Sequence, residues 1–474
     1  MSAVGDNRFG GIHPGDVLQL DIQETVHADF LGKMDVTFLS LLRYLPGRRS
    51  VWKARCEFGE LFIKVFFPHP KQDRDVGREW RHSIRLHDAE MPMAEPYFLA
   101  RGGEGCSILG FAYLEGGVTL DALASLAWQD ADRSDVYRQL LDLHSRMFAA
   151  GIYQEDNHLG NYFWHQGEVR LLDAATCCFV DPPVDGGRLR ENLSLLLANI
   201  PLPDRRCVDS LIANSDLRQA GVGGREASRA IQTRLRKYYR KTRRSCSEFE
   251  LLREGAESWL LCRDLEPELR EQVLSGMDAL FAGGTWLKDG NTCSVVEVEV
   301  KGRSYIVKRY NRKPWLYRLL HCLATPRALE SWSNGHVLRL FGIATPRPLA
   351  CGVIRSGGLP ELAYLVMEKV EGPPLWDLPE DELMEQGSGL AQQFGQLLWS
   401  LDTLQATHGD MKGSNLVVDQ RDVLTLIDLD GTRFYCTASK HRKKRDKDIR
   451  RFLRNWDKMP EVRNMFSRVI DAVD

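Results

Sequence analysis

The stretch that decides the fold is His408-Gly409-Asp410-Met411-Lys412-Gly413-Ser414-Asn415, followed by Leu426-Ile427-Asp428. An aspartate is followed by an asparagine five residues later and by a second aspartate thirteen residues after that. The same order recurs upstream in Gln154-Glu155-Asp156-Asn157-His158-Leu159-Gly160-Asn161 and Leu171-Leu172-Asp173. The two copies lie 254 residues apart (410 − 156), which is the length of a domain. The chain therefore predicts two related domains.

Two carboxylates and an amide in this order are the side chains that phosphoryl transfer from Mg-ATP needs. Asp410 would orient the acceptor hydroxyl and take its proton. Asn415 and Asp428 would supply the hard oxygen ligands that Mg²⁺ prefers. A single Asp-x-x-x-x-Asn is more often a turn or a cap. The interpretation therefore depends on the ordered series, which occurs twice.

A β-hairpin that ends in a lysine is predicted ahead of each series. The distance from Ser50 to Lys64 and from Ser294 to Lys308 is 14 residues in both halves. The second hairpin alternates Val with Glu over residues 295–300, which is the pattern of a half-exposed strand. The turns are expected at Phe58-Gly59 and Lys301-Gly302.

A helix that contains one tryptophan follows each hairpin, and an acidic residue on it would hold the lysine. Glu79 lies 15 residues after Lys64, and Glu330 is the candidate in the second half. Alignment on the shared tryptophan instead places Ser331 opposite Glu79.

Both halves resemble the protein-kinase-like fold, and His408-Gly409-Asp410 with Ile427-Asp428-Leu429-Asp430 resembles the lipopolysaccharide core heptose kinases of Gram-negative bacteria. The resemblance implies an α+β fold of two tandem bilobal kinase-like domains, residues 1–240 and 241–474. Each would have a small antiparallel-sheet lobe and a mainly helical lobe. It implies ATP and Mg²⁺ as cofactors, with these site residues: catalytic Asp410, Lys412 and Asp156; nucleotide-binding Lys308, Glu330, Lys64 and Glu79; metal-binding Asn415, Asp428, Asn161 and Asp173.

The first half departs from this pattern in its loop, where Gln154-Glu155 replaces His408-Gly409. The carboxylate of Glu155 beside Asp156 adds like-charge repulsion at the expected base. We expect the second half to be catalytic, and the first half to be either a second active domain or a degenerate one.

The acceptor is expected to be a small molecule or a sugar, because only 46 residues follow Asp428 and no Ala-Pro-Glu motif follows either metal aspartate. The resemblance implies a heptose of the lipopolysaccharide inner core. Another small-molecule kinase of the same fold, of the aminoglycoside or choline type, remains an alternative. A nucleotide-binding pseudokinase scaffold is a third.

Composition favours a reducing, cytoplasmic location, because the 11 cysteines form no C-x-x-C and no stretch of about 20 apolar residues occurs. The net charge of −2 makes the basic runs at residues 234–244 and 440–451 local patches. Such runs are usually solvated helix faces, and the amphipathic stretch 314–321 fits lobe packing, but both can also contact an anionic membrane surface. The resemblance implies a lipopolysaccharide core acceptor presented at the cytoplasmic face of the inner membrane. No nucleic acid is expected, because no RNA- or DNA-binding motif accompanies the basic runs.

Overall fold

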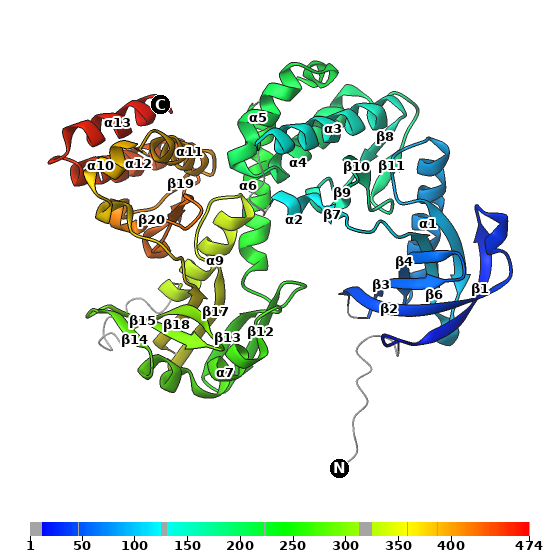
Figure 1. Ribbon diagram of the computed structural model, residues 1–474, viewed down its shortest axis with the longest axis horizontal. Helices are drawn as coiled ribbons and strands as arrows, with labels where there is room; N and C mark the ends of the chain where they lie inside the picture. Colours follow the sequence, from blue (N-terminus) through cyan, green and yellow to red (C-terminus); the bar gives the residue numbers. More distant parts are fainter. Residues whose placement is uncertain are drawn as a thin grey trace, which may run out of the picture. The chain divides into compact units, whose positions relative to one another are not determined.

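The computed structural model describes residues 12–45, 47–124, 130–221, 224–311, 325–357, 359–385 and 387–473. The chain forms two compact units (Figure 1). The first unit runs to Ile200 and includes Arg205–Ala227, and the second contains Pro201–Asp204 and Ser228–Asp474. Both units combine an antiparallel sheet with helices, so the predicted mixture of sheet and helix is confirmed. The amphipathic stretch 314–321 lies outside the described residues.

The division lies near Ala227, whereas the sequence analysis placed it near residue 240. The difference arises because most of helix α6 (Gly224–Lys241), from Ser228 onward, belongs to the second unit. Its Gln232 side chain donates a hydrogen bond to the backbone oxygen of Leu404 at 3.1 Å. The basic run at 234–244 therefore belongs with the second unit rather than with a linker.

The first unit begins with a six-stranded antiparallel sheet that closes on itself, because β5 pairs with both β6 and β1. Helix α1 packs beside β5 and β6, and a buried cluster that includes Trp80 joins the helix to the sheet. The elements are β1 (Val17–Thr25), β2 (Lys33–Leu45), β3 (Arg49–Cys56), β4 (Gly59–Phe66), α1 (Gln72–Asp88), β5 (Pro96–Arg101) and β6 (Ser107–Ala112).

The rest of the first unit is mainly helical, with short strands that carry its loop residues. The side chain of Asp185 caps α4 by accepting hydrogen bonds from two backbone N–H groups of its first turn, which fixes where the helix begins. The elements are β7 (Val118–Thr119), α2 (Leu120–Ala124), α3 (Asp130–Ala149), β8 (Ile152–Gln154), β9 (Tyr162–His165), β10 (Glu168–Leu171), β11 (Cys177–Phe179), α4 (Gly186–Asn199) and α5 (Leu202–Ala213).

The second unit begins with an open seven-stranded antiparallel sheet in the order β12-β13-β17-β18-β16-β15-β14. Helices α7 and α9 each pack against it through a separate buried cluster, and Trp332 of α9 is fully buried there. The elements are β12 (Phe249–Glu254), β13 (Glu257–Cys262), α7 (Pro267–Ala282), β14 (Thr285–Asp289), β15 (Cys293–Val300), β16 (Arg303–Tyr310), α9 (Arg327–Leu340), β17 (Pro348–Ser356) and β18 (Leu359–Glu368).

The hairpin of β15 and β16 shows how the sequence pattern sets the register. Val296, Val298 and Val300 are buried, and the two glutamates between them, Glu297 and Glu299, face outward. Lys301 and Gly302 both have positive φ, of 50° and 73°, which is the geometry of a two-residue hairpin turn. The hairpin predicted in the first unit also forms, but its turn residues are Glu57 and Phe58, because Cys56 pairs with Gly59.

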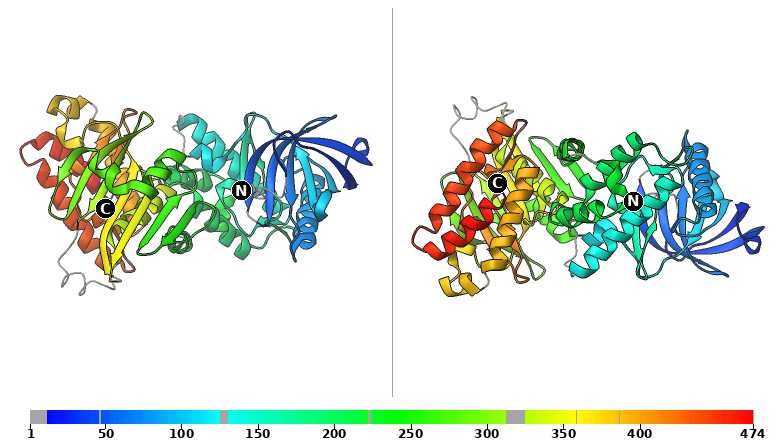
Figure 2. Two further views of the ribbon diagram at one scale, coloured as in Figure 1. Left: turned by 90° about the horizontal axis from the view of Figure 1, so that it is seen from below. Right: turned by 90° about the horizontal axis from the view of Figure 1, so that it is seen from above.

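The remainder of the second unit is a helical lobe in which α11, α12 and α13 pack together, seen in orange and red in Figure 2. Two short strand pairs, β19 with β22 and β20 with β21, hold the loop that begins at His408. No helix of the described residues combines the length and apolar character that a bilayer crossing needs. The elements are α10 (Glu380–Glu385), α11 (Gly387–Thr403), β19 (Ala406–Thr407), β20 (Leu416–Val418), β21 (Leu424–Leu426), β22 (Arg433–Phe434), α12 (Ala438–Asn455) and α13 (Pro460–Asp471).

Candidate active site

The loop of the second unit that follows β19 is tied down on both sides of Asp410. His408 Nε2 donates to the backbone oxygen of Ile427 at 3.0 Å, which joins the loop to the strand that precedes Asp428. Gly409 has a φ of +82°, and a Cβ there would lie 2.5 Å from the backbone oxygen of Gly431. The position therefore requires glycine. His408 thus has the packing and hydrogen-bonding role that suits a loop residue.

Asp410 is surrounded by positive charge. Its carboxylate lies 3.4 Å from Lys412 Nζ and 2.5 Å from Arg451 Nη2, and its side chain is 31% exposed. Arg451 belongs to α12, and the same helix carries Asp448, which accepts a hydrogen bond from the Gly409 backbone N–H at 2.8 Å. Helix α12 therefore holds both the loop backbone and the carboxylate of Asp410.

The structure brings Asn415 and Asp428 side by side. The Ile427 backbone N–H donates to the Asn415 backbone oxygen at 2.9 Å. The Asn415 side-chain amide donates to the Asp410 backbone oxygen at 2.9 Å, so its own oxygen is the atom left to face a ligand. Asp428 is in the left-handed region, with φ of 59° and ψ of 67°. That conformation is costly for a residue with a side chain and is common at functional sites.

Lys308, on β16, is buried and lies between two carboxylates. Its Nζ is 2.6 Å from Asp428 Oδ1 and 2.9 Å from Asp430 Oδ2. Asp430 is only 10% exposed and is held further by Arg327 at 2.6 Å and by the hydroxyl of Tyr310 at 2.6 Å. Asp430 is thus the centre of a buried charged network.

This network changes two expectations. Glu330, expected to hold Lys308, instead forms an ion pair with Arg433 at 2.9 Å. Ser331, which aligns with Glu79, donates to Asp430 Oδ1 at 2.8 Å. The carboxylate that fixes Lys308 therefore comes from the segment after Asp428 and not from helix α9.

The charges of this cluster reinforce each other. Burial alone would lower the pKa of Lys308, but the negative charges of Asp430 and Asp428 outweigh burial and raise that pKa. Burial likewise would raise the pKa of Asp430, but Lys308 and the hydrogen bond from Tyr310 hold it below its ordinary value. Lysine and aspartate therefore both remain charged at neutral pH.

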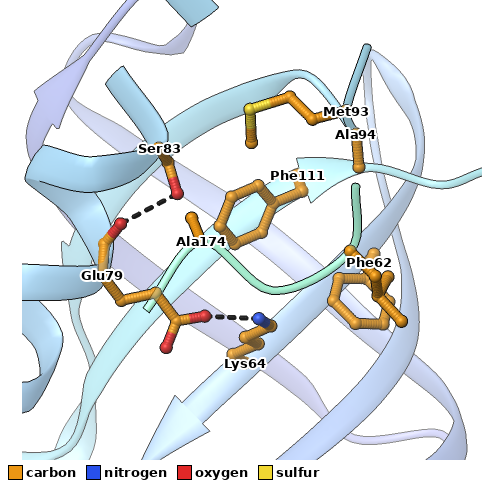
Figure 3. A pocket seen from close by; sticks show the side chains of 9 residues that line it. Phe62, Lys64, Glu79, Ser83, Met93, Ala94, Phe111 and Ala174 are labelled. Carbon is orange, nitrogen blue, oxygen red and sulfur yellow. Dashed lines mark hydrogen bonds and ion pairs between the residues drawn. The ribbon is translucent and has the colours of Figure 1, made fainter. Parts of the chain in front are cut away.

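In the first unit, Lys64 of β4 and Glu79 of α1 form a buried ion pair, as Figure 3 shows. Arg49 adds a second contact to Glu79 at 3.2 Å. Burial would raise the pKa of Asp173, but the positive charges of Lys64 and Arg49 outweigh it and lower that pKa. The predicted Lys64, Glu79 and Asp173 therefore lie together.

The loop of the first unit is built differently around its aspartate. Asp156 is 68% exposed, and its ion partner is His158 at 3.8 Å. Asn161 donates to the Asp156 backbone oxygen at 2.6 Å, and its backbone oxygen accepts from Leu172 at 2.8 Å, as in the second unit. The backbone of the two loops is thus alike. The environment of the carboxylate is not.

A small cavity lies beside Lys64 in the first unit and is lined by aromatic and apolar side chains (Figure 3). The rings of Phe62 and Phe111 lie 5.7 and 5.5 Å from Lys64 Nζ. The cavity volume is about 10 Å³, which is room for about one water molecule. Small-molecule sites commonly enclose about 300 Å³ or more. A nucleotide does not fit in this cavity.

The strand register identifies the matching positions in the second unit. Phe62 pairs with Phe111 two residues before Lys64, and Ile306 pairs with Met367 two residues before Lys308. Residues two apart on a strand share a face, so each pair lies on the side of its sheet that carries the lysine. The second unit therefore has smaller, non-aromatic side chains where the first has two phenyl rings.

The sequence analysis did not single out Asp430 or Arg451 as site residues. A signal was present for Asp430, because it stands two residues after Asp428 in Ile427-Asp428-Leu429-Asp430. Arg451 lies inside a basic run and 41 residues after Asp410 (451 − 410), so spacing alone could not have selected it.

Comparison with known proteins finds a family match in the second half of the chain. Residues 283–472 match the family described as lipopolysaccharide kinase (Kdo/WaaP) family. A 3-deoxy-D-manno-octulosonic acid kinase of Photobacterium profundum is 29% identical over 140 residues, which are 29% of this chain and 56% of that protein. The corresponding kinase of Vibrio parahaemolyticus is 29% identical over 121 residues, 25% of this chain and 47% of that protein. The chain spans about half the length of these curated relatives.

Two solved structures are also similar. WaaP in complex with acyl carrier protein is 18% identical with a TM-score of 0.31, over 44% of this chain and 88% of that one. A Toxoplasma gondii rhoptry antigen kinase domain is 11% identical with a TM-score of 0.32, over 42% and 80%. The resemblance predicted from the His-Gly-Asp loop is confirmed by the family match: residues 283–472 resemble the lipopolysaccharide kinase (Kdo/WaaP) family.

Proposed function

We propose that this chain is an ATP-dependent phosphotransferase that phosphorylates a sugar hydroxyl of the lipopolysaccharide inner core, with the second unit catalytic. The observation that carries the proposal is the cluster of Asp410, Lys412, Asn415, Asp428 and Lys308 in the part of the chain that matches the lipopolysaccharide kinase family. The resemblance favours a heptose, and the curated relatives' printed activity favours 3-deoxy-D-manno-octulosonic acid.

The donor set fits Mg-ATP. Asn415 and Asp428 offer an amide oxygen and a carboxylate, and Mg²⁺ commonly takes one or two protein oxygens and completes its shell with water and phosphate. The described residues hold no cluster of three or more His, Cys, Asp or Glu suited to a metal. Asn415 and Asp428 are the candidate pair of the second unit, and Asn161 and Asp173 are the equivalent pair of the first. Bound Mg²⁺ would neutralise the phosphates of ATP.

The chain's own residues supply the remaining chemistry. Asp410 accepts the proton of the acceptor hydroxyl. Lys412, 3.4 Å from Asp410, offers positive charge to the phosphoryl group as it moves. Lys308 binds the phosphates of the nucleotide, and Asp430 holds Lys308 in position. In this proposal the first unit is a degenerate domain, since Gln154-Glu155 replaces His408-Gly409 and Asp156 is 68% exposed with His158 as its ion partner.

A half-exposed tryptophan supports a sugar as the acceptor. Trp376 is 46% exposed, and the turn that carries it contacts the turn Gly413–Asn415 of the catalytic loop. Its ring lies 5.7 Å from that of the buried Trp456, which fixes its position. A flat aromatic surface of this kind can pack against the apolar face of a sugar ring. Peripheral attachment at the inner membrane, on the cytoplasmic side, is part of the proposal, because such acceptors are lipid-anchored.

The test is transfer of labelled γ-phosphate from Mg-ATP onto underphosphorylated core lipopolysaccharide by the full chain. Asp410→Ala and Asp156→Ala run in parallel, with acceptors that expose either a heptose or 3-deoxy-D-manno-octulosonic acid. Label that is lost only with Asp410→Ala supports the proposal, and the labelled acceptor identifies the sugar. Absence of label from every sugar acceptor would contradict it and favour another small-molecule kinase or the pseudokinase scaffold.

A further inference from the structure

Helix α12, drawn in orange in Figure 1, carries a series of basic residues that the proposed mechanism does not use. Five basic residues follow one another at intervals of four, three, four and three, which places them on one face of a helix. All five are exposed. We call this face the basic stripe; it consists of Lys440, Lys444, Lys447, Arg451 and Arg454.

The stripe is electrostatically uncompensated over most of its length. Among the described residues, no carboxylate forms an ion pair with Lys440, Lys444 or Lys447. The acidic residue of α12 nearest to Arg451, Asp448, turns to the Gly409 backbone N–H instead. Like charges this close on a helix are mutually unfavourable, so an anionic partner would stabilise them.

The stripe reaches the reaction centre near its C-terminal end. Arg451 Nη2 lies 2.5 Å from Asp410 Oδ1, the proposed base. From Arg451 the stripe extends over eleven residues to Lys440, which is about 16 Å along a helix. A group bound to Lys444 or Lys447 would therefore lie within one or two sugar residues of the hydroxyl that reacts.

We propose that the basic stripe binds carboxylate or phosphate groups of the sugar acceptor and so aligns its hydroxyl with Asp410. This inference rests on the proposed function and names the acceptor class as an anionic oligosaccharide. Charge complementarity carries it, because a neutral or cationic acceptor would leave the stripe unmatched. An acceptor anion that draws Arg451 away also frees Asp410 Oδ1 for the proton of the hydroxyl.

The experiment measures binding apart from catalysis. The probe is a deacylated core oligosaccharide that contains 3-deoxy-D-manno-octulosonic acid, titrated by calorimetry into the full chain without ATP. The test variant is Lys444→Gln/Lys447→Gln. The control is Arg442→Gln, which removes an exposed charge on the opposite side of the same helix, nine residues or about 180° from Arg451.

We expect the double variant to bind the oligosaccharide at least about tenfold more weakly than the native chain, since each lysine near an anionic group contributes about 1 kcal/mol. Arg442→Gln should bind like the native chain. Added salt should weaken binding by the native chain more than binding by the double variant, because the variant lacks two of the positive charges that salt screens. Unchanged binding in the double variant, equal weakening in Arg442→Gln, or no native binding would each overturn the inference.

Two further measurements separate the alternatives. Vesicles with anionic phosphatidylglycerol but no sugar acceptor test a membrane role. Loss of vesicle binding in the double variant, with oligosaccharide binding intact, would assign the stripe to the membrane and overturn the inference. Phosphate transfer is assayed separately. Oligosaccharide binding without phosphate transfer by the native chain would contradict the proposed function alone. Equal transfer rates in the native chain and the double variant would contradict the inference alone.

Discussion

The two units hold their equivalent lysines, Lys64 and Lys308, in two different ways. In the first unit, Lys64 pairs with Glu79 of the helix that follows its hairpin. In the second unit, the helix offers Ser331 at that position, and Lys308 pairs instead with Asp428 and Asp430. A carboxylate is therefore present beside each lysine, but it comes from a different part of the chain.

The comparison shows that a well-formed lysine–glutamate pair is not a sufficient sign of an active site. The first unit has the pair but fills the space beside it with Phe62 and Phe111. The second unit lacks the pair but surrounds its base, Asp410, with Lys412 and Arg451. A buried ion pair is by itself weak evidence for stability, because the desolvation of its two charges offsets much of their attraction.

The largest expected difference between the units concerns the two candidate bases. Asp410→Asn should lower phosphate transfer by about 10²-fold or more, because the acceptor hydroxyl loses its proton acceptor. Asp156→Asn should leave transfer unchanged, since that carboxylate is 68% exposed and has His158 as its ion partner in place of a lysine and an arginine. Initial rates with labelled ATP and circular dichroism of both variants measure this. A large loss with Asp156→Asn would mean that both units are catalytic.

The next largest effect concerns Asp430, which holds Lys308 in place of a glutamate on helix α9. Asp430→Asn should lower kcat/KM for ATP by about tenfold to 100-fold, because Lys308 would then be held by Asp428 alone and would compete with the metal for it. Asp430→Glu should recover part of the loss.

Glu79→Gln is the matched control, since it removes the lysine's carboxylate in the first unit. It should change the thermal stability of the chain and not its transfer rate. An Asp430→Asn variant with native KM for ATP and a lowered melting temperature would make Asp430 structural.

Much of the fold and part of the site of the second unit could be predicted from the sequence, and what could not be predicted has physical causes. The hairpin of β15 and β16 followed from the Val–Glu alternation, because one face of that strand is buried. Asn415 directly precedes β20 and Asp428 lies two residues after β21, so the two flank the open end of one hairpin and their proximity was also expected. The partner of Lys308 was not expected, because a carboxylate from any segment that folds nearby can pair with a lysine. Arg451 was hidden for the same reason: a helix far along the chain brings it to Asp410.

A smaller effect tests the cavity difference. Ile306→Phe in the second unit should raise KM for ATP by about tenfold, because a phenyl ring on the face of Lys308 would occupy the space that Phe62 fills in the first unit. The reciprocal change, Phe62→Ile with Phe111→Met, should leave transfer unaltered. Nucleotide titrations of the purified variants measure both. Native affinity in a folded Ile306→Phe variant would exclude this face as the nucleotide site.

The smallest expected effect concerns the acceptor side of the second unit. Trp376→Ala should raise KM for the sugar acceptor by a few fold and leave KM for ATP unchanged, because an aromatic contact of this kind contributes about 0.5–1.5 kcal/mol beyond its area. Trp286→Ala is the matched control: Trp286 is similarly exposed, at 49%, but lies on β14, away from the loop that holds Asp410. If both variants raise the acceptor KM equally, exposed tryptophan is a general surface effect. If only Trp376→Ala does, the acceptor lies against the turn Gly413–Asn415 of the loop that holds Asp410.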